Sequence, residues 1–260
     1  MDTPELTPTP SHRRRTILIV AVAIALVAAG VTTGVLLSGG SKKHPVAQPS
    51  PTPISSAIPT PTPTPTPSTS SAPPLPHEVV AAAAPTEFEL KGAAFDIKAH
   101  VCGMDNVRPL DPPGEQHHTV CWVREGFGVA PGTTSGTTYV LGHAWGQDSH
   151  EVLNALSEAA MKQVLKEESH PVPLAGIDTW PVTAMNGYAL ILKTPKGTLT
   201  YTVKDTYAVR KSQAGNVTPL MNESTPNRTV IITCGELNHH DYDYNIIVEA
   251  YLSSSVATKV

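Results

Sequence analysis

Prolines are distributed unevenly along this chain, and their distribution limits which part of it can form a folded domain. Half of the 26 prolines lie between Pro45 and Pro85, and residues 59–67 alternate strictly between proline and threonine. Proline restricts φ and lacks a backbone donor, so this segment cannot form a helix or a central strand. Residues 38–85 are therefore predicted to be a disordered Pro/Thr/Ser-rich linker. A spacer role is the simplest interpretation, while recognition by a proline-binding module and O-glycosylation of the threonines stay open.

Residues 16–37, ahead of this linker, form an apolar run without a charged residue. At about 1.5 Å per residue the run would extend about 33 Å as a helix, enough to cross a hydrocarbon core of roughly 30 Å. Arg13, Arg14 and Arg15 directly before it favour a cytoplasmic N-terminus. The alternative is a cleaved signal peptide, whose apolar region would typically span only about 7 to 15 residues. We therefore expect a cytoplasmic tail (1–15), a transmembrane helix (16–37) and a single-pass cell-membrane protein whose C-terminal domain is extracellular.

The remaining residues, 86–260, suffice for one domain with a well-buried core. Short apolar or alternating runs separated by turn residues predict strands. The predicted strands cover residues 88–101, 119–124, 137–141, 188–192, 198–203, 230–234 and 245–250. One helix is predicted over 148–166, where Asp148 would cap the first turn together with Glu151. The pattern therefore indicates a mostly-β domain, and many short strands with one helix fit a closed barrel.

Two of these strands end in residues that could carry chemistry. The run Val230–Ile232 leads into a Thr-Cys pair that ends at Cys234, and the run Thr137–Leu141 leads into a Gly-His pair that ends at His143. A thiol and an imidazole at strand ends suggest a cysteine nucleophile with a histidine acid/base. The alternative for Cys234 is a buried structural cysteine, which is the commoner state of a free thiol.

The sequences YVLGHAW around His143 and VIITCGE around Cys234 resemble the two signatures of the sortases, the surface cysteine transpeptidases of bacteria. The order and separation of the motifs, the N-terminal apolar run and the proline-rich linker fit this resemblance. It extends over about residues 86–252 and is of the actinobacterial class E/F type. The resemblance implies a closed eight-stranded β-barrel with one or two short helices. It also implies that Cys234 is the nucleophile and His143 the acid/base.

The arginine that sortases carry on the strand after the cysteine is missing here, because no arginine follows Arg228. Depending on how the intervening loop is aligned, its place falls on Asn245 or Asp243. An asparagine amide can donate to an oxyanion, whereas an ionised aspartate only accepts. We therefore expect Asn245 to be the replacement catalytic residue. An arginine from another strand, Arg124 or Arg210, is the alternative.

Three cysteines leave at least one thiol without an intramolecular partner. Cys102 and Cys121 lie on neighbouring predicted strands and could pair, which would leave Cys234 free, but connectivity cannot be deduced from sequence. The stretch 239–241, His-His-Asp, could bind zinc together with Cys234. Structural zinc sites need four well-spaced ligands, and no second cysteine lies nearby. We therefore expect neither a metal nor a cofactor.

The formal charge of −4 and the lack of a basic patch argue against a nucleic-acid partner. The resemblance instead implies that the substrates are exported proteins with an LPxTG-like C-terminal sorting signal. Cleavage would pass through a Cys234 acyl-enzyme, and a cell-wall precursor or pilin amine would accept the exported protein. Two alternatives stay open. One is a cysteine hydrolase on the same fold, and the other is a catalytically impaired barrel that binds a peptide or a wall component.

Overall fold

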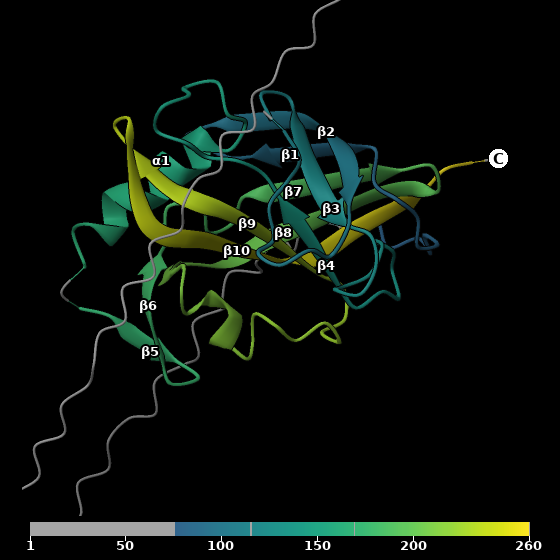
Figure 1. Ribbon diagram of the computed structural model, residues 1–260. Helices are drawn as coiled ribbons and strands as arrows, with labels where there is room; N and C mark the ends of the chain where they lie inside the picture. The colour runs from purple at the N-terminus through teal and green to yellow at the C-terminus, as the bar shows by residue number, and fades with distance from the viewer. Residues whose placement is uncertain (1–75, 115, 169, 260) are drawn as a thin grey trace, which may run out of the picture. The chain divides into compact units, whose positions relative to one another are not determined.

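The computed structural model describes residues 76–114, 116–168 and 170–259 (Figure 1). The tail predicted over 1–15, the transmembrane helix predicted over 16–37 and most of the predicted linker lie outside these residues. Within the part of the chain that is described, no helix is long and apolar enough to span a membrane.

The described residues form ten strands in one sheet, one α-helix and one short 3₁₀ helix. The strands are β1 (Glu87–Lys91), β2 (Asp96–Met104), β3 (Thr119–Val123), β4 (Thr137–Leu141), β5 (Val172–Leu174), β6 (Ile177–Val182), β7 (Ala189–Thr194), β8 (Gly197–Arg210), β9 (Arg228–Leu237) and β10 (His240–Ala257). The helices are α1 (Asn154–Val164) and η1 (Ala214–Asn216). The mostly-β class predicted from the sequence is confirmed.

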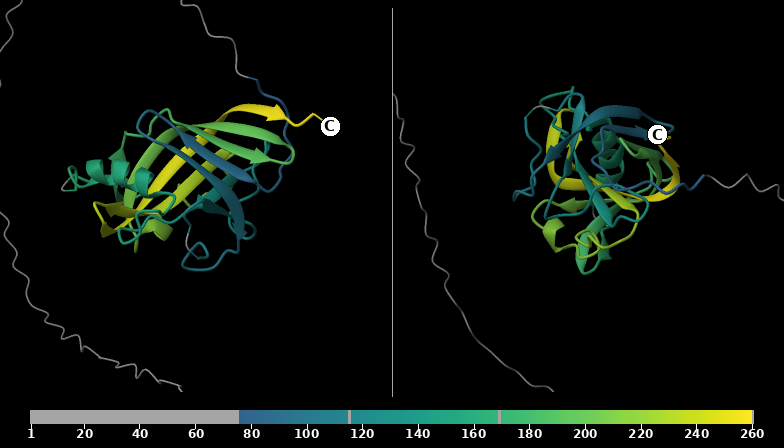
Figure 2. Two further views of the ribbon diagram at one scale, coloured as in Figure 1. Left: turned by 90° about the horizontal axis from the view of Figure 1, so that it is seen from above. Right: turned by 90° about the vertical axis from the view of Figure 1, so that its right-hand side faces the viewer.

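Eight of the strands close into a barrel. Their order around it is β10-β9-β4-β3-β2-β1-β7-β8, and pairing of β8 with β10 completes the ring. Figure 2 shows the strands wrapping around this ring, with α1 at the end opposite the C-terminus. The predicted closed eight-stranded barrel is therefore confirmed. Closure covers sheet edges that would otherwise be exposed.

Strands β4 and β9 are covered on both faces, and their side chains alternate between two apolar clusters. Val140 and Ile231 point into the main core inside the barrel. Tyr139 and Leu141 belong to a second apolar cluster, which also contains residues from the segments after β2, β3 and β8. Because side chains alternate along a strand, Cys234 lies on the same face of β9 as this second cluster.

Helix α1 begins later than the sequence predicts, at Asn154 instead of residue 148. The prediction that Asp148 and Glu151 cap the helix is wrong, because both carboxylates have other hydrogen-bond partners. Asp148 accepts hydrogen bonds from its neighbours in the loop, and Glu151 accepts the backbone N–H of Gln116 at 3.0 Å. The actual N-cap, Leu153, makes no side-chain cap. The helix is held by tertiary packing, since its buried side chains lie against β9.

The sequence does not predict the hairpin of β5 and β6, because Pro171 and Pro173 suggest a break in regular structure. The two strands pair through a tight turn at Ala175 and Gly176, whose φ angles are 51° and 84°. Positive φ at both central residues is the geometry of a two-residue hairpin. Strand β6 pairs with the C-terminal half of β8, so the hairpin extends the sheet beyond the barrel.

Residues 76–85, at the end of the predicted linker, lie against the barrel. His77 forms an isolated β-bridge with Ser255, and Val80 is only 1% exposed in the main core. The backbone N–H of Thr133 donates to the Val80 carbonyl at 3.0 Å. The contacts of the folded domain therefore begin ahead of β1.

A disulfide joins Cys102 on β2 to Cys121 on β3, and Cys234 is the free thiol. The two strands are parallel, and the two cysteines are direct partners in the register, with Cα atoms 4.4 Å apart. The structure therefore has the pairing that the sequence left open.

Replacing both Cys102 and Cys121 by serine is expected to lower the free energy of unfolding by about 3 kcal/mol, because the bridge closes a loop with a sequence separation of 19. Urea denaturation of the oxidised wild type and the double variant measures this difference. A Cys234→Ser variant is the control, since it removes a thiol outside the bridge. Equal stability of the wild type and the double variant would show that the bridge does not form.

Candidate active site

The pairing of β4 with β9 places His143 level with Cys234. The strands are parallel, and Thr137 pairs with Arg228, an offset of 91 residues (228 − 137 = 91). The same offset separates His143 from Cys234 (234 − 143 = 91). Neighbouring strands lie about 4.8 Å apart. Continuing the register two residues beyond its last pair, Leu141 with Ile232, brings His143 level with Cys234, and both residues line one cavity.

The antiparallel pairing of β9 with β10 puts Asn245 directly opposite Cys234. Directly opposed side chains in such a pair have Cβ atoms about 4.5 to 5.5 Å apart. Asp243 falls in the stretch between Tyr242 and Asn245 where the register shifts, and its side chain is exposed. Of the two positions that the sequence left open, Asn245 is the one that lies beside the thiol.

Helix α1 fixes the backbone on both sides of the thiol. The Ser157 hydroxyl donates to the Cys234 carbonyl at 2.8 Å and accepts the backbone N–H of Glu236 at 2.6 Å. A Cβ added at Gly235 would lie 3.0 Å from the Met161 sulfur. The glycine after the cysteine therefore lets β9 pack tightly against the helix.

His143 is held from three directions. The backbone N–H of Gly142 donates to the Ile232 carbonyl at 3.3 Å, and the His143 carbonyl accepts the N–H of Leu153 at 3.1 Å. The side-chain Nε2 lies 3.1 Å from the Pro112 carbonyl, in the loop between β2 and β3. A Cβ at Gly142 would lie 2.6 Å from a Leu153 methyl, which explains the glycine before the histidine.

Two cavities meet at Cys234. The larger one, of about 420 Å³, has polar side chains in its wall: His143, Trp145, Glu151, Lys211 and Asp241. The other, of about 390 Å³, reaches Asn245 and is mainly apolar, with side chains from the second cluster: Leu110, Phe127, Leu220, Met221 and Ile232. Both volumes lie within the range of about 300 to 1,000 Å³ that is typical of ligand sites. The thiol can therefore be reached through two cavities, of which the second has the larger number of apolar side chains.

Neither of the two arginines named as alternatives lines these cavities. Arg124 forms an ion pair with Asp105 at 2.6 Å. Arg210 forms an ion pair with Glu168 at 3.0 Å, and its guanidinium lies 4.2 Å from the ring centre of Tyr244. Both side chains are held by partners away from the thiol, so the structure gives no support to either as the replacement.

Arg228 stabilises the fold and does not belong to the site. Only 3% of its surface is exposed, and it forms a buried ion pair with Glu249 at 3.1 Å. It also donates to the Thr137 hydroxyl and to backbone carbonyls of the segment before β9. Arg228 lies six positions from Cys234 along β9, which corresponds to about 20 Å. It therefore links β9, β4 and β10 and does not reach the thiol.

The cationic residues that do line the cavities are Arg108 and Lys211, and sequence reasoning missed both. Arg108 lies in the β2–β3 loop with its guanidinium 4.7 Å from the Phe127 ring centre. Lys211 directly follows β8 and lines both cavities. Only the β8–β10 register, which pairs Arg210 with Tyr244, brings Lys211 to this place.

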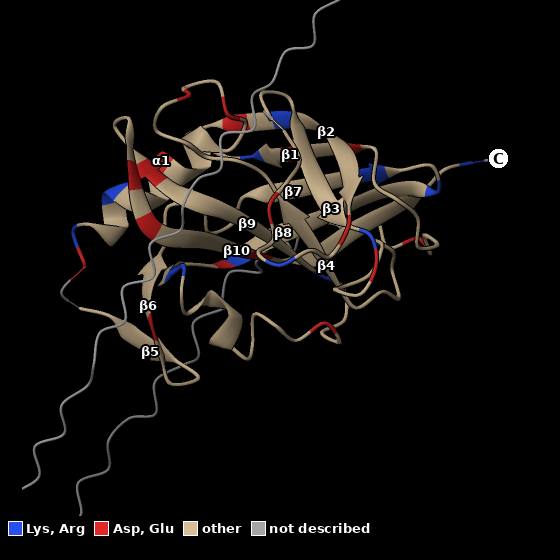
Figure 3. Cartoon of the chain, in the orientation of Figure 1, with Lys and Arg blue, Asp and Glu red and all other residues tan. Residues whose placement is uncertain are grey.

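Acidic residues border the site. Figure 3 shows Asp and Glu gathered on β9 and β10 near α1. Burial raises the pKa of the Glu236 carboxyl, and a hydrogen bond from the His239 backbone N–H acts in the opposite direction. A carboxyl that ionises less readily leaves less negative charge near a thiolate at Cys234. Asp241 is exposed and lines the polar cavity.

The His-His-Asp stretch 239–241 consists of the second residue of the turn between β9 and β10 and the first two residues of β10. Asn238 and His239 have φ of 53° and 62°, as in a tight hairpin turn. Asp241 accepts the backbone N–H of Gly146 at 2.7 Å, and Nδ1 of His239 lies 3.2 Å from the Gly146 carbonyl. The stretch therefore ties the hairpin to the loop that carries His143.

Comparison with known proteins identifies the family. No curated protein sequence matches this chain. Sortase A of Listeria monocytogenes has 12% identity and a TM-score of 0.41, covering 69% of this chain and 92% of that one. Sortase E1 of Streptomyces coelicolor, solved with a tripeptide in its active site, has 12% identity and a TM-score of 0.39, covering 68% and 94%. The sortase domain model matches residues 93–253, more than half of the chain. The chain therefore belongs to the sortase family.

Proposed function

We propose that this protein is a membrane-anchored cysteine transpeptidase. It cleaves an LPxTG-like sorting signal of an exported protein through a Cys234 acyl-enzyme and transfers that protein to a cell-wall or pilin amine. Family membership supports the reaction class. The observation that carries the assignment of residues is the register of β9. Continued beyond the end of β4, the offset of 91 residues brings His143 level with Cys234, and Asn245 on β10 pairs directly with Cys234.

The reaction needs a nucleophile, a proton carrier and a donor for the oxyanion. The Cys234 thiolate attacks the scissile carbonyl carbon, and the oxygen becomes an anion that the Asn245 amide stabilises. When the C–N bond breaks, His143 gives its proton to the leaving amine and a thioester remains. The incoming amine then attacks the thioester, His143 takes its proton, and the thiolate leaves. One amide bond is exchanged for another, and no water is consumed.

The hydrogen bond of His143 to Pro112 supports one of the two ring nitrogens as the proton carrier. A carbonyl oxygen only accepts, so Nε2 must carry a hydrogen. The Nδ1 atom is then the nitrogen that gives and takes the proton during catalysis.

The two cavities offer separate places for the two substrates. The apolar cavity suits the leucine and proline of the sorting signal, because it is lined mainly by apolar side chains. The polar cavity contains His143 and the exposed carboxylate of Asp241. A protonated amine is attracted to such a carboxylate before His143 takes up its proton. Peptide and amine would then approach Cys234 from opposite sides.

The N-terminal residues fit this activity if they act as an anchor and a spacer. The apolar run 16–37 would hold the protein in the membrane, and the proline-rich residues that follow it, up to the start of the folded domain near residue 76, would carry the barrel outward. Exported substrates and wall precursors meet at that surface. A mature chain whose N-terminus lies beyond Leu37 would contradict the retained anchor.

The proposed function is tested by incubating the purified full chain with an LPxTG-like peptide and measuring its intact mass. We expect an adduct of the peptide acyl group on Cys234, and its transfer to an added primary amine. Hydrolysis of the adduct at a rate that the amine does not change would instead indicate a cysteine hydrolase. Peptide binding without any adduct would indicate a binding barrel.

The binding barrel is the second candidate because the residue opposite Cys234 is a neutral asparagine. Hydrogen bonds to a charged donor are roughly twice as strong as those to a neutral one. An oxyanion next to Asn245 is therefore stabilised less than one next to a cation. We favour the transpeptidase because the thiol and imidazole are aligned and both face open cavities.

A further inference from the structure

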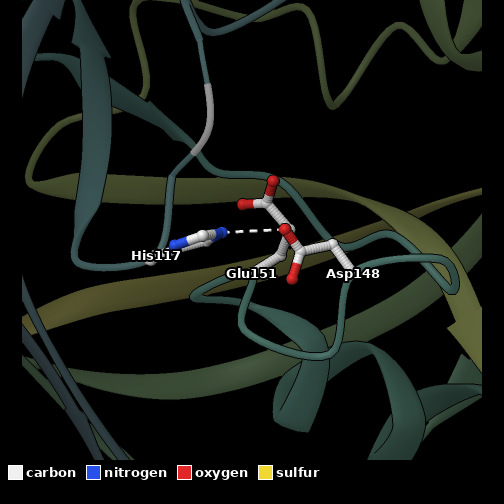
Figure 4. Close-up of side chains that lie close together, drawn as sticks. All are labelled: His117, Asp148 and Glu151. Carbon is white, nitrogen blue, oxygen red and sulfur yellow. Dashed lines mark hydrogen bonds and ion pairs between the residues drawn. The ribbon is translucent and has the colours of Figure 1, made fainter.

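Three side chains with metal-ligand chemistry lie together beside the polar cavity. They are His117, Asp148 and Glu151, and their ligand atoms all lie within 4.8 Å of one another. Figure 4 shows the imidazole and both carboxylates turned toward a common space. His117 comes from the loop before β3, and the two acids come from the loop between β4 and α1. Sequence reasoning did not find this group, because His117 lies thirty-one positions ahead of Asp148.

A second imidazole, that of His150 in the loop between β4 and α1, lies at the edge of the group. Nδ1 of His150 is 3.3 Å from one Asp148 oxygen, and Nε2 of His117 is 2.8 Å from the other. The two imidazole rings are 5.6 Å apart, centre to centre. Two imidazoles and two carboxylates are therefore available within one small region.

Glu151 is the residue that most needs a cation. It is 5% exposed, and its side chain accepts one hydrogen bond, from the backbone N–H of Gln116. Among the described residues, no lysine or arginine forms an ion pair with it. A buried carboxylate is costly without a compensating charge, and the nearby carboxylate of Asp148 adds repulsion. Both imidazoles, of His117 and His150, pair with Asp148, and among the described residues no ion pair to Glu151 is formed.

The ligand atoms of this group indicate which metal ion it would bind. Imidazole nitrogen with carboxylate oxygen suits zinc and similar transition metals, whereas calcium takes six to eight oxygen ligands. Zinc lies about 2.0 to 2.2 Å from such atoms, so tetrahedral ligand atoms are about 3.4 Å apart. The separations in this group, from 2.8 Å up to 4.8 Å, bracket that value.

We propose that His117, Asp148 and Glu151 bind a divalent transition-metal ion of the zinc type. The ion neutralises the buried carboxylate and joins the β2–β3 loop to the β4–α1 loop. The first loop carries Pro112 and the second carries His143. The imidazole of His143 contacts the backbone carbonyl of Pro112 at the active site. The metal therefore stabilises the arrangement around His143 without taking part in the acyl transfer.

Titration calorimetry with zinc chloride tests the site, with the full chain carrying Cys234→Ala so that the catalytic thiol does not bind zinc. We expect one equivalent of zinc to bind and the melting temperature to rise. The variants His117→Ala and Asp148→Asn should each weaken binding at least about tenfold. Asp148→Asn keeps the shape of the side chain, so it stays informative if His117→Ala does not fold.

The matched control is His118→Ala, which removes the adjacent, exposed imidazole. It should leave zinc binding unchanged. The proposal is overturned if zinc does not bind, or if it binds with equal affinity to the wild-type site and to both site variants. Binding of calcium in preference to zinc would overturn the assigned class of ion. None of these outcomes depends on the acyl-transfer activity, because the test chain lacks the nucleophile.

Discussion

Replacing Cys234 by alanine is expected to reduce acyl transfer to the uncatalysed background, because no other described thiol is free. His143→Ala should lower turnover by about 10²- to 10⁴-fold, the usual contribution of a positioned acid/base. Both effects are measured as the rate of amine-dependent product formation from an LPxTG-like peptide. The mass of the enzyme gives a second readout, since the Cys234→Ala chain should form no adduct.

Two control variants separate chemistry from folding. The Cys102→Ser, Cys121→Ser chain loses a disulfide but keeps the nucleophile, so it should form the adduct at temperatures where it stays folded. His118→Ala removes an exposed imidazole and should keep full activity. If Cys234→Ala still forms an acyl adduct, the assignment of the nucleophile is wrong. If His143→Ala is as fast as wild type, another group carries the proton.

The position of the thiol and the imidazole could be predicted because both follow strongly apolar runs. Val230–Ile232 and Thr137–Leu141 are buried from end to end or nearly so, and such runs are recognisable without knowledge of the partner strand. The separation of 91 residues then equals the offset of the parallel register. The separation could be read from the sequence, but only the structure shows that it equals the offset between β4 and β9 and that both residues line one cavity.

Other parts of the site could not be predicted, because they depend on contacts between distant loops. Lys211 reaches the cavities through the β8–β10 register, and Arg108 through the course of the β2–β3 loop. Asp148 looked like a helix cap from its local sequence. Its carboxylate instead lies 2.8 Å from Nε2 of His117, thirty-one positions away. Local propensity is a weak guide where such tertiary contacts compete with it.

The prediction with the next largest effect concerns Asn245. Removing one oxyanion donor in other acyl-transfer enzymes costs about 10²- to 10³-fold in turnover. We expect a loss of this size for Asn245→Ala, with the substrate KM changing much less, because the donor acts on charge that develops in the transition state. Asn245→Asp should be slower still, since an ionised carboxylate opposes the oxyanion. Steady-state rates for the three chains measure this order.

Asn245→Arg should raise turnover above wild type, because a charged donor forms hydrogen bonds roughly twice as strong as a neutral one. The matched control is Asp243→Arg, which adds the same charge two positions away, where the register shifts and the side chain is exposed. It should give little gain. Equal gains from both variants would mean that any added cation near the rim attracts substrate. If Asn245→Ala is as fast as wild type, the donor lies elsewhere. Lys211 is then the next residue to replace, because it lines both cavities that meet at Cys234.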